Sequence, residues 1–215
     1  VEWDSSIYEQ CGKNKDYLLF FGRLQLHKGF HVLAQAIPRF LETYPNAYVI
    51  CVGLDASSRV SKSMRSYSFS LAGRNVSRLI FVDQVPHRQL YPIIANAKLV
   101  ALPSLIDNIP NACLEAMLLG KPVVGTRGAS FEEILDDGKT GFLVPAGDVD
   151  ALSKKLVNAW KSPNLSKIGK AAKEKSKEFS FEKTIPRIVD YYSSVIANFS
   201  KSKNLVVKES FKEQE

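Results

Sequence analysis

The sequence contains little that would tie the chain together covalently or hold it in a membrane. Its 215 residues include three cysteines, Cys11, Cys51 and Cys113, two of them inside apolar runs. An odd number of thiols in such positions favours a reducing compartment over a disulfide framework. No apolar run approaches the roughly 18 residues of a membrane span, and the first residues, which do not begin with Met, lack signal-peptide features. We therefore expect a compact cytoplasmic protein that is a piece of a longer one.

Several common cofactor motifs are also missing. No G-x-G-x-x-G follows any expected strand, which argues against a dinucleotide cofactor. The GKT at 138–140 lacks the first glycine of a phosphate-binding P-loop, since that position is Glu133. The histidines His27, His31 and His87 do not cluster, and no cysteine has a metal-ligand partner at suitable spacing. We expect no metal and no cofactor.

What the chain does have is an ordinary globular composition with an excess of positive charge. Apolar residues make up 45% and charged residues 24% of the sequence, and the formal net charge is +7. The excess predicts an anionic partner. The lysines at positions 154, 155, 161, 167, 170, 173, 175 and 177 form either solvated helix faces or a peripheral contact with anionic lipid.

Apolar runs and helical periods alternate along the chain. Continuous apolar runs predict buried parallel strands at 17–22, 47–53, 79–83, 98–103, 122–126 and 141–144. Helical spacing predicts helices at 28–44, 57–72, 87–95, 110–119, 131–135, 148–160, 165–178 and 181–199. This order predicts an α/β fold with a Rossmann-like, doubly wound parallel sheet, whose ligands bind beyond the carboxyl ends of the strands.

Two cations follow the first expected strand. Arg23 stands directly after the strand end at Gly22, and Lys28 stands at the start of the next helix. Positive side chains beside the free N–H groups of a helix start favour a phosphate group. Two solvated surface cations explain the same residues.

An isolated carboxylate lies in the helix after the fourth strand. Glu115 is surrounded by apolar neighbours, so burial without a partner would be costly. The hydroxyls of a sugar or ribose would satisfy it, and so would a structural arginine. Asp107 precedes it by eight residues, and we expect unpaired main-chain N–H groups at Asn111 and Ala112 to point into the same crevice.

Taken together, these motifs carry a resemblance. GR-x4-KG at 22–29, D-x7-E at 107–115, the block LEAMLLGKPVVGT and EILDDGKTGFLV at 133–144 resemble the retaining glycosyltransferases of family 4. The similarity runs from about Tyr17 to Trp160 and matches the nucleotide-sugar-binding C-terminal half of the GT-B fold. The helix opened by Phe179-Ser180-Phe181-Glu182 is similar to the family's closing helix.

The resemblance implies roles for individual residues. Arg23 and Lys28 hold the donor diphosphate, and Glu115 accepts the ribose hydroxyls. The backbone at Val85 borders the base, with Leu90 packing nearby, and Leu114 lines the pocket. Asn111 and Ala112 offer main-chain N–H groups to phosphate, and Asp107 meets the sugar hydroxyls. The implied catalytic residues are Arg23, Lys28 and Asp107, and the implied substrate-binding residues are Gly22, Arg23, Lys28, Val85, Leu90, Asp107, Asn108, Ile109, Pro110, Asn111, Ala112, Leu114 and Glu115.

The chain departs from the family pattern at two of these positions. Asp107 stands where the family has Glu, so its carboxyl reaches one methylene less far, and Asn108 replaces the usual proline. Asp148 and Asp150 spell the D-x-D of metal-dependent glycosyltransferases, but they open a helix, where Asp148 is a natural N-cap.

The resemblance implies a metal-independent, retaining transfer of a hexosyl group from a UDP- or GDP-type nucleotide sugar in polysaccharide biosynthesis. We expect residues 17–178 to bind this donor, 179–200 to form the closing helix and 201–215 to form a charged tail. Residues 1–16 are then a linker from a missing N-terminal domain that holds the acceptor sugar or lipid-linked saccharide. We expect the chain alone to transfer sugar poorly or not at all. The alternatives are a nucleotide-binding module without catalysis and a basic surface that binds nucleic acid or membrane. The resemblance itself implies that nucleic acid is not a partner.

Overall fold

A computed structural model describes residues 2–212, with side chains for residues 2–199. Its strands are β1 (Asp16–Phe21), β2 (Ala47–Val52), β3 (Leu79–Val82), β4 (Leu99–Ala101), β5 (Val123–Arg127) and β6 (Phe142–Pro145). Its α-helices are α1 (Ser6–Cys11), α2 (Phe30–Thr43), α3 (Met64–Ala72), α4 (His87–Asn96), α5 (Asn111–Leu118), α6 (Phe131–Ile134), α7 (Val149–Trp160), α8 (Leu165–Ser176) and α9 (Phe181–Lys212). Short 3₁₀ helices cover Gly73–Arg78 and Lys177–Phe179.

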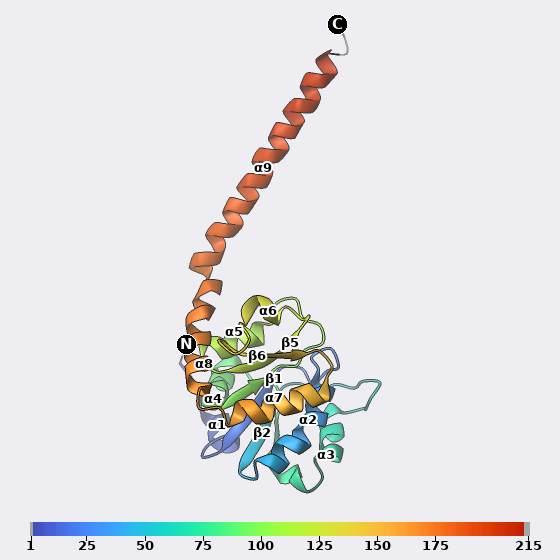
Figure 1. The fold of residues 1–215 in the computed structure, drawn as a ribbon, viewed down its shortest axis with the longest axis vertical. Coiled ribbons are helices and arrows are strands. Elements are labelled where there is room, and N and C mark those ends of the chain that lie inside the picture. The colour runs from blue at the N-terminus through green and yellow to red at the C-terminus, as the bar shows by residue number, and fades with distance from the viewer. Residues whose placement is uncertain (1, 213–215) are drawn as a thin grey trace. The chain divides into compact units, whose positions relative to one another are not determined.

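The six strands form one parallel sheet in the order β3-β2-β1-β4-β5-β6 (Figure 1). The predicted doubly wound α/β fold is therefore confirmed. The chain order reverses between β1 and β4, and in such sheets ligands bind beyond the carboxyl ends of the strands at this switch point. We call the side of the sheet where the strands end the carboxyl edge and the side where they begin the amino edge.

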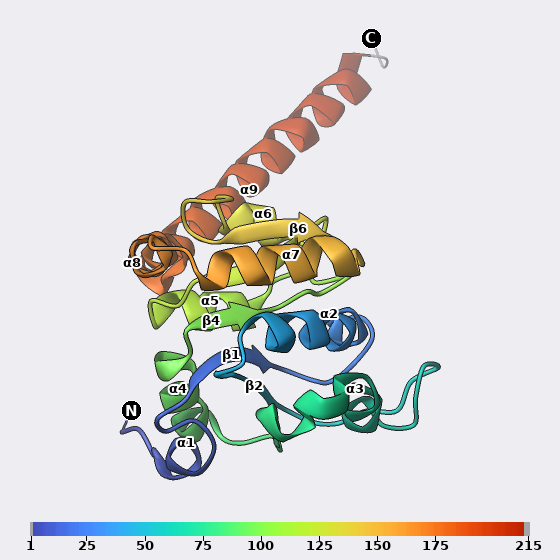
Figure 2. The same ribbon diagram turned by 60° about the horizontal axis from the view of Figure 1, so that its bottom comes forward.

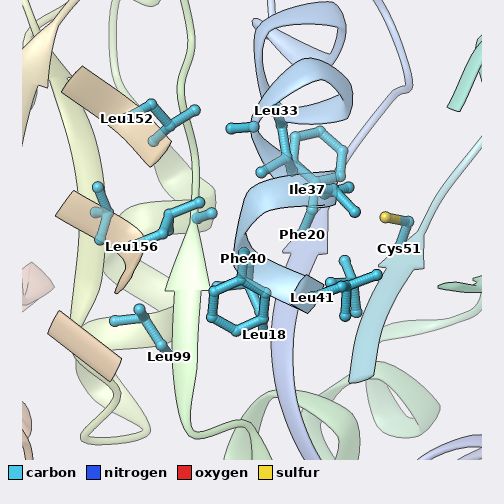
Figure 3. Close-up of a cluster of buried hydrophobic side chains, with 14 of the residues drawn as sticks. Leu18, Phe20, Leu33, Ile37, Phe40, Leu41, Cys51, Leu99, Leu152 and Leu156 are labelled. Atoms are coloured by element: carbon cyan, nitrogen blue, oxygen red, sulfur yellow. The ribbon is translucent and has the colours of Figure 1, made fainter. Parts of the chain in front are cut away.

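Helices cover both faces of the sheet because its strands are apolar on both faces. Figure 2 shows α2 and α7 side by side over one face, where α3 also packs. The buried cluster there joins Leu18 and Phe20 of β1 to Phe40 of α2 and Leu156 of α7 (Figure 3). Helices α1, α4, α5 and α8 contribute to the second cluster, on the opposite face. Burial of these side chains, about 1.5–3 kcal/mol each, fixes the sheet on which the strand-end loops are mounted.

The chain divides into two compact units at Ser176 and Lys177, near the expected boundary after residue 178. The segment expected to be a linker, 1–16, contains α1, whose Cys11 is buried in the second cluster. A helix, α9, amphipathic by sequence, lies where the closing helix is expected, and it continues to Lys212 through most of the expected charged tail. Positions 213–215 of that tail lie outside the described residues.

The expected helix at 57–72 is wrong in its first half. Residues 57–63 form a loop, and α3 begins only at Met64. Two hydrogen-bond acceptors at the start of α3 explain why the helix begins later than predicted. The Ser63 hydroxyl accepts from Ser66 N at 3.0 Å, and Asp55 Oδ1 accepts from Met64 N at 2.9 Å. These side chains satisfy N–H groups that the helix itself leaves unpaired.

Within residues 2–212, no helix combines the length and the apolar character needed to cross a membrane.

Candidate functional site at the carboxyl edge

A cavity of about 270 Å³ lies at the carboxyl edge, beside the switch point. The loops after β1, β2 and β3 form its walls together with α4 and α5. The structure brings six of the predicted site residues together in this one cavity: Gly22, Arg23, Val85, Leu90, Ala112 and Glu115.

Glu115 supplies the carboxylate of this cavity. It lies in α5, and its side chain retains 25% of its exposure. Burial raises the pKa of this carboxyl, while the imidazole of His87, with Nε2 3.4 Å from Oε1, acts in the opposite direction. Among the described residues no arginine lies within salt-bridge distance of Glu115, so the alternative of a structural arginine partner is wrong. The carboxylate is thus available to accept hydrogen bonds from a ligand.

Arg23 is exposed at the rim of the same cavity, directly after β1. In the part of the chain with described side chains, no carboxylate lies within salt-bridge distance of its guanidinium. The cavity therefore combines an open cation with a partly buried hydrogen-bond acceptor, and a ligand with both an anionic group and hydroxyls satisfies the two.

Lys28 and Asp107 meet in a smaller cavity of about 120 Å³, which shares Phe21, Gly22 and Ala112 with the first. Lys28 Nζ lies 2.7 Å from Asp107 Oδ2, and the Asp107 side chain is 12% exposed. The Ser104 hydroxyl also donates to Asp107 Oδ2, at 3.3 Å. Lys28 is therefore held beside the larger cavity, with Asp107 as its counterion.

The approach of two loops explains why Lys28 and Asp107 meet although 79 positions separate them. Leu105 N donates to His27 O at 2.8 Å, which joins the loop after β1 to the loop after β4. At Gly29, φ is +66°, and a Cβ atom would stand 1.6 Å from Pro103 O. Only glycine permits this close contact.

Four predicted residues line neither cavity. Asn108 and Ile109 are exposed on the loop that leads into α5, Asn111 is exposed at the first position of α5, and Leu114 packs against the second core cluster instead. The main-chain N–H of Asn111 is not free as expected, because it donates to Ile109 O at 2.8 Å in a turn. Pro110 lines the smaller cavity beside Asp107.

Six further residues line the larger cavity and were not among the predicted site residues; Phe21, Val52 and Gly53 lie at strand ends, and the other three lie beyond them. Leu54 follows β2, Gln84 follows β3, and His87 begins α4. The signal was present, since each stands within a few residues of a strand end. His87 adds a contact to Glu115 that no sequence spacing indicates.

The two acids of the D-x-D motif have structural roles. Asp148 Oδ1 accepts from Ala151 N at 2.9 Å, which confirms the predicted N-cap of α7. Asp150 forms an ion pair with Arg39, Oδ1 to Nη1 3.1 Å. Within the described residues, no group of three or more His, Cys, Asp or Glu side chains is placed to hold a metal ion.

Comparison with known proteins identifies the family. The family model described as "Glycosyl transferases group 1" matches residues 15–162. A D-inositol 3-phosphate glycosyltransferase of Corynebacterium urealyticum is 33% identical, over 82% of this chain and 42% of that protein. A phosphatidyl-myo-inositol mannosyltransferase of Mycobacterium leprae is 28% identical, over 90% of this chain and 50% of that protein. The chain thus spans half or less of the length of these relatives.

Solved structures agree on the fold. HepE of Anabaena, solved with UDP and glucose, is 25% identical with a TM-score of 0.73, and the match covers 88% of this chain and 52% of that one. The C-terminal domain of LpcC from Francisella tularensis is 20% identical with a TM-score of 0.71, and the match covers 83% of this chain and 94% of that one. The chain therefore belongs to the group 1 glycosyltransferases and corresponds to the C-terminal domain of their GT-B fold.

Proposed function

We propose that the two carboxyl-edge cavities bind a nucleoside diphosphate sugar of the UDP or GDP type. In the whole protein, the hexosyl group is then transferred to an acceptor with retention of configuration and without a metal ion. The observation that carries this proposal is that Arg23 and Glu115 line one cavity, with Lys28 in the adjoining one. The similarity to HepE, which was solved with UDP and glucose, supports it.

The nucleoside occupies the larger cavity in this proposal. Glu115 accepts hydrogen bonds from both ribose hydroxyls, and such charge-assisted bonds contribute roughly 1.5–3 kcal/mol each. Val85, Leu90 and Leu54 provide apolar contacts for the base. Packing of one face of a base contributes less binding free energy than these two hydrogen bonds together, so Glu115 contributes the larger share of the nucleoside affinity.

The diphosphate lies toward Lys28 and the start of α5. Arg23 and Lys28 neutralise the charge that grows on the departing diphosphate as the bond to the sugar breaks. The N-terminus of α5, at Ala112, adds the partial positive charge of a helix start. Because these groups are already in place, the protein itself supplies the stabilisation for which other enzymes use a metal ion.

Asp107 has two tasks in this account. It holds Lys28 through the 2.7 Å contact of its carboxyl with Nζ, and it accepts a hydrogen bond from a hydroxyl of the donor sugar. Because Asp is shorter than Glu, Asp107→Glu is the variant that tests its reach. We expect Asp107→Glu to bind UDP as the wild type does and to change the affinity for the sugar-bearing donor.

The acceptor binds outside this chain, in the N-terminal domain of the whole protein. The names of two relatives, which act on D-inositol 3-phosphate and phosphatidyl-myo-inositol, support a sugar or lipid-linked acceptor and a peripheral contact with membrane. We expect the 215-residue chain to bind donor while releasing little or no sugar from it.

A nucleotide titration tests the proposal. Calorimetry with UDP, GDP and ADP, each with Mg²⁺ and with EDTA, is expected to show micromolar binding of one nucleotide, equal in both buffers. Equal binding of all three that disappears with rising salt would instead indicate a general basic surface.

Two variants assign the roles of the charged residues. Lys28→Ala is expected to weaken binding of the diphosphate about tenfold or more while leaving the nucleoside unaffected, since it removes a charge-assisted contact. Glu115→Ala is expected to weaken both. Lys62→Gln, which changes an exposed lysine elsewhere, is the control for Lys28→Ala, because each of these two variants loses one positive charge. An equal loss of nucleoside and diphosphate affinity in Lys28→Ala would remove Lys28 from the phosphate site.

One observation favours a second function, a nucleotide-binding module without transfer. The first acid of the family pattern is shortened here to Asp107 and is already paired with Lys28. The full-length protein, assayed for sugar release from the donor that binds best, separates the two functions.

A further inference from the structure

A second cavity, of about 500 Å³, lies at the amino edge of the sheet. It is bordered by Lys98, just before β4, by the turn between α5 and β5 with Lys121, and by the loop that joins α7 to α8. The strands of a parallel sheet all begin at this edge, so the cavity lies at the opposite edge from the proposed donor site.

Its lining is positively charged. Lys98, Lys121 and Lys161 line it, and among residues 2–199 no acidic side chain does. The three lysines come from three separate loops, so their convergence is a product of the fold and not of a charged segment.

Lys98 is fixed in position. Its Nζ lies 4.5 Å from the ring centre of Trp160, a distance typical of a cation–π contact, and 3.6 Å from Asp16 Oδ2. Trp160 is itself 6% exposed and packs edge-on against Phe40. These two contacts hold the Lys98 side chain at one wall of the cavity.

Lys121 and Lys161 have no such counterion. Lys121 is partly buried, and burial lowers the pKa of its ammonium group. In the part of the chain with described side chains, no carboxylate lies within 4.0 Å of either Nζ. A partly buried ammonium without a partner costs free energy, and an anion in the cavity offsets that cost.

Neutral donors complete the lining. Ser162, in the loop before α8, and Ser166, in the first turn of α8, line the cavity, and the dipole of α8 also favours an anion there. Trp160 and the neighbouring prolines offer apolar surface beside them. The volume exceeds what a bare phosphate needs, so there is room for an organic group next to the charge.

We propose that this amino-edge cavity is a second binding site, for a phosphate ester held by Lys98, Lys121 and Lys161. A phosphate monoester has a charge of about −1.5 to −2 near neutral pH and three acceptor oxygens, which suits three ammonium groups and two hydroxyls. The phosphate belongs either to a small soluble ester or to a lipid headgroup. This site is independent of the function proposed for the carboxyl edge.

A titration followed by amide NMR tests the site on the whole 215-residue chain. Inorganic phosphate, added at constant ionic strength against chloride, is expected to produce saturable shifts at the amides of Gly120, Ser162 and Ser166. Residue-by-residue detection separates these shifts from any phosphate binding near Arg23. Absence of saturable shifts at these three amides would overturn the proposal.

Variants provide the second readout. Lys121→Gln and Lys161→Gln are each expected to weaken phosphate binding about tenfold, the effect of one lost charge-assisted contact. Lys62→Gln, an exposed lysine elsewhere, makes the same change of net charge and is expected to leave the affinity unchanged. Unaltered binding in both cavity variants, with unchanged amide spectra elsewhere, would contradict the site.

Vesicles distinguish the two sources of phosphate. Wild-type chain is sedimented with phosphatidylcholine vesicles that contain or lack one quarter phosphatidic acid, whose headgroup is a phosphate monoester. Sedimentation with the anionic vesicles that is lost in Lys121→Gln and Lys161→Gln assigns the site to a lipid headgroup. Phosphate binding in solution without sedimentation assigns it to a soluble ester, and either result supports the phosphate site.

Discussion

The two edges of the sheet carry two different kinds of charged cavity. At the carboxyl edge, Arg23 and Glu115 place a cation and a carboxylate around one space, and Lys28 is neutralised by Asp107 next to it. At the amino edge, three lysines line one cavity, and no acid with a described side chain joins them there. The first arrangement suits a ligand with hydroxyls and phosphates, and the second suits an anion alone.

The backbone is also constrained differently at the two edges. At the carboxyl edge, Gly53 has φ +146°, and a Cβ atom there would stand 2.0 Å from Gly22 O. At the amino edge, a Cβ atom on Gly169 would stand 2.2 Å from Gly120 O, while the left-handed conformation there belongs to Gly120, with φ +70°. Close contact and left-handed conformation therefore coincide in one residue, Gly53, at the carboxyl edge and are divided between two glycines at the amino edge.

The largest expected effect is that of Gly53→Ala, which breaks this backbone arrangement. Left-handed strain and overpacking each cost about 1–3 kcal/mol, so we expect a loss of roughly 3 kcal/mol or more in the free energy of unfolding. Gly169→Ala is expected to lose less, because only the contact changes. Urea denaturation measures both.

Gly73→Ala is the matched control for Gly53→Ala. Gly73 has φ +53° but would place its Cβ in open space, so only the conformational cost of about 1–2 kcal/mol remains. Equal losses in Gly53→Ala and Gly73→Ala would show that the contact with Gly22 contributes nothing.

The next largest expected effect is on ligand binding, and it distinguishes the ligand of the carboxyl edge from that of the amino edge. Arg23→Ala is expected to weaken UDP or GDP binding about tenfold or more and to leave the phosphate-induced shifts at Ser162 unchanged. Lys121→Gln is expected to do the reverse. Calorimetry and amide NMR on the same two variants provide the test. A variant that weakens the binding of both ligands equally would mean that the two edges do not act independently.

A smaller effect concerns the acids at the start of α7. Asp148→Ala removes the N-cap bond to Ala151 and is expected to cost about 1 kcal/mol of stability. Nucleotide affinity is expected to stay the same, with or without Mg²⁺. Asp150→Ala, at an exposed ion pair, is the control and is expected to cost less. Loss of nucleotide binding in Asp148→Ala would mean that Asp148 belongs to the donor site.

The smallest expected effect depends on pH. Folding raises the pKa of Glu115 through burial, so the folded chain holds this proton more tightly than the unfolded chain does. Ionised Glu115 therefore lowers stability above its raised pKa, and this penalty disappears as the pH falls toward the ordinary value of 4.5. Glu115→Gln is expected to be the more stable protein at pH 8, with the difference narrowing toward pH 4.5.

Urea titrations at several pH values measure this difference, and exposed Glu133→Gln is the control. The same Glu115→Gln variant is expected to bind nucleotide more weakly, since the amide loses the charge. A gain of stability together with unchanged nucleotide affinity would mean that Glu115 does not contact the ligand.

The fold was predictable because its signals are local. A run such as Tyr17–Phe21 is apolar on both faces, and only a covered strand accommodates that pattern. The place of the cavity followed from the strand ends, and the structure places Arg23 and Glu115, both predicted site residues, in its lining. The start of α3 was missed, because Asp55 and Ser63 cap it through contacts that periodicity does not reveal.

The finer parts of both edges depend on contacts between distant segments. No sequence pattern indicates that Asp107 neutralises Lys28, or that His87 lies beside Glu115. Likewise, Lys161 fits a solvated helix end when seen alone, and only the fold brings it to Lys121. Charge pairing across loops is a property of the folded chain.

The most direct test of the account is a crystal structure of the chain with UDP or GDP, whichever binds more tightly. The account predicts the ribose within hydrogen-bond distance of the Glu115 carboxylate and the diphosphate beside Arg23 and Lys28. A nucleotide bound away from this cavity, or one that touches Arg23 while its ribose points away from Glu115, would contradict it.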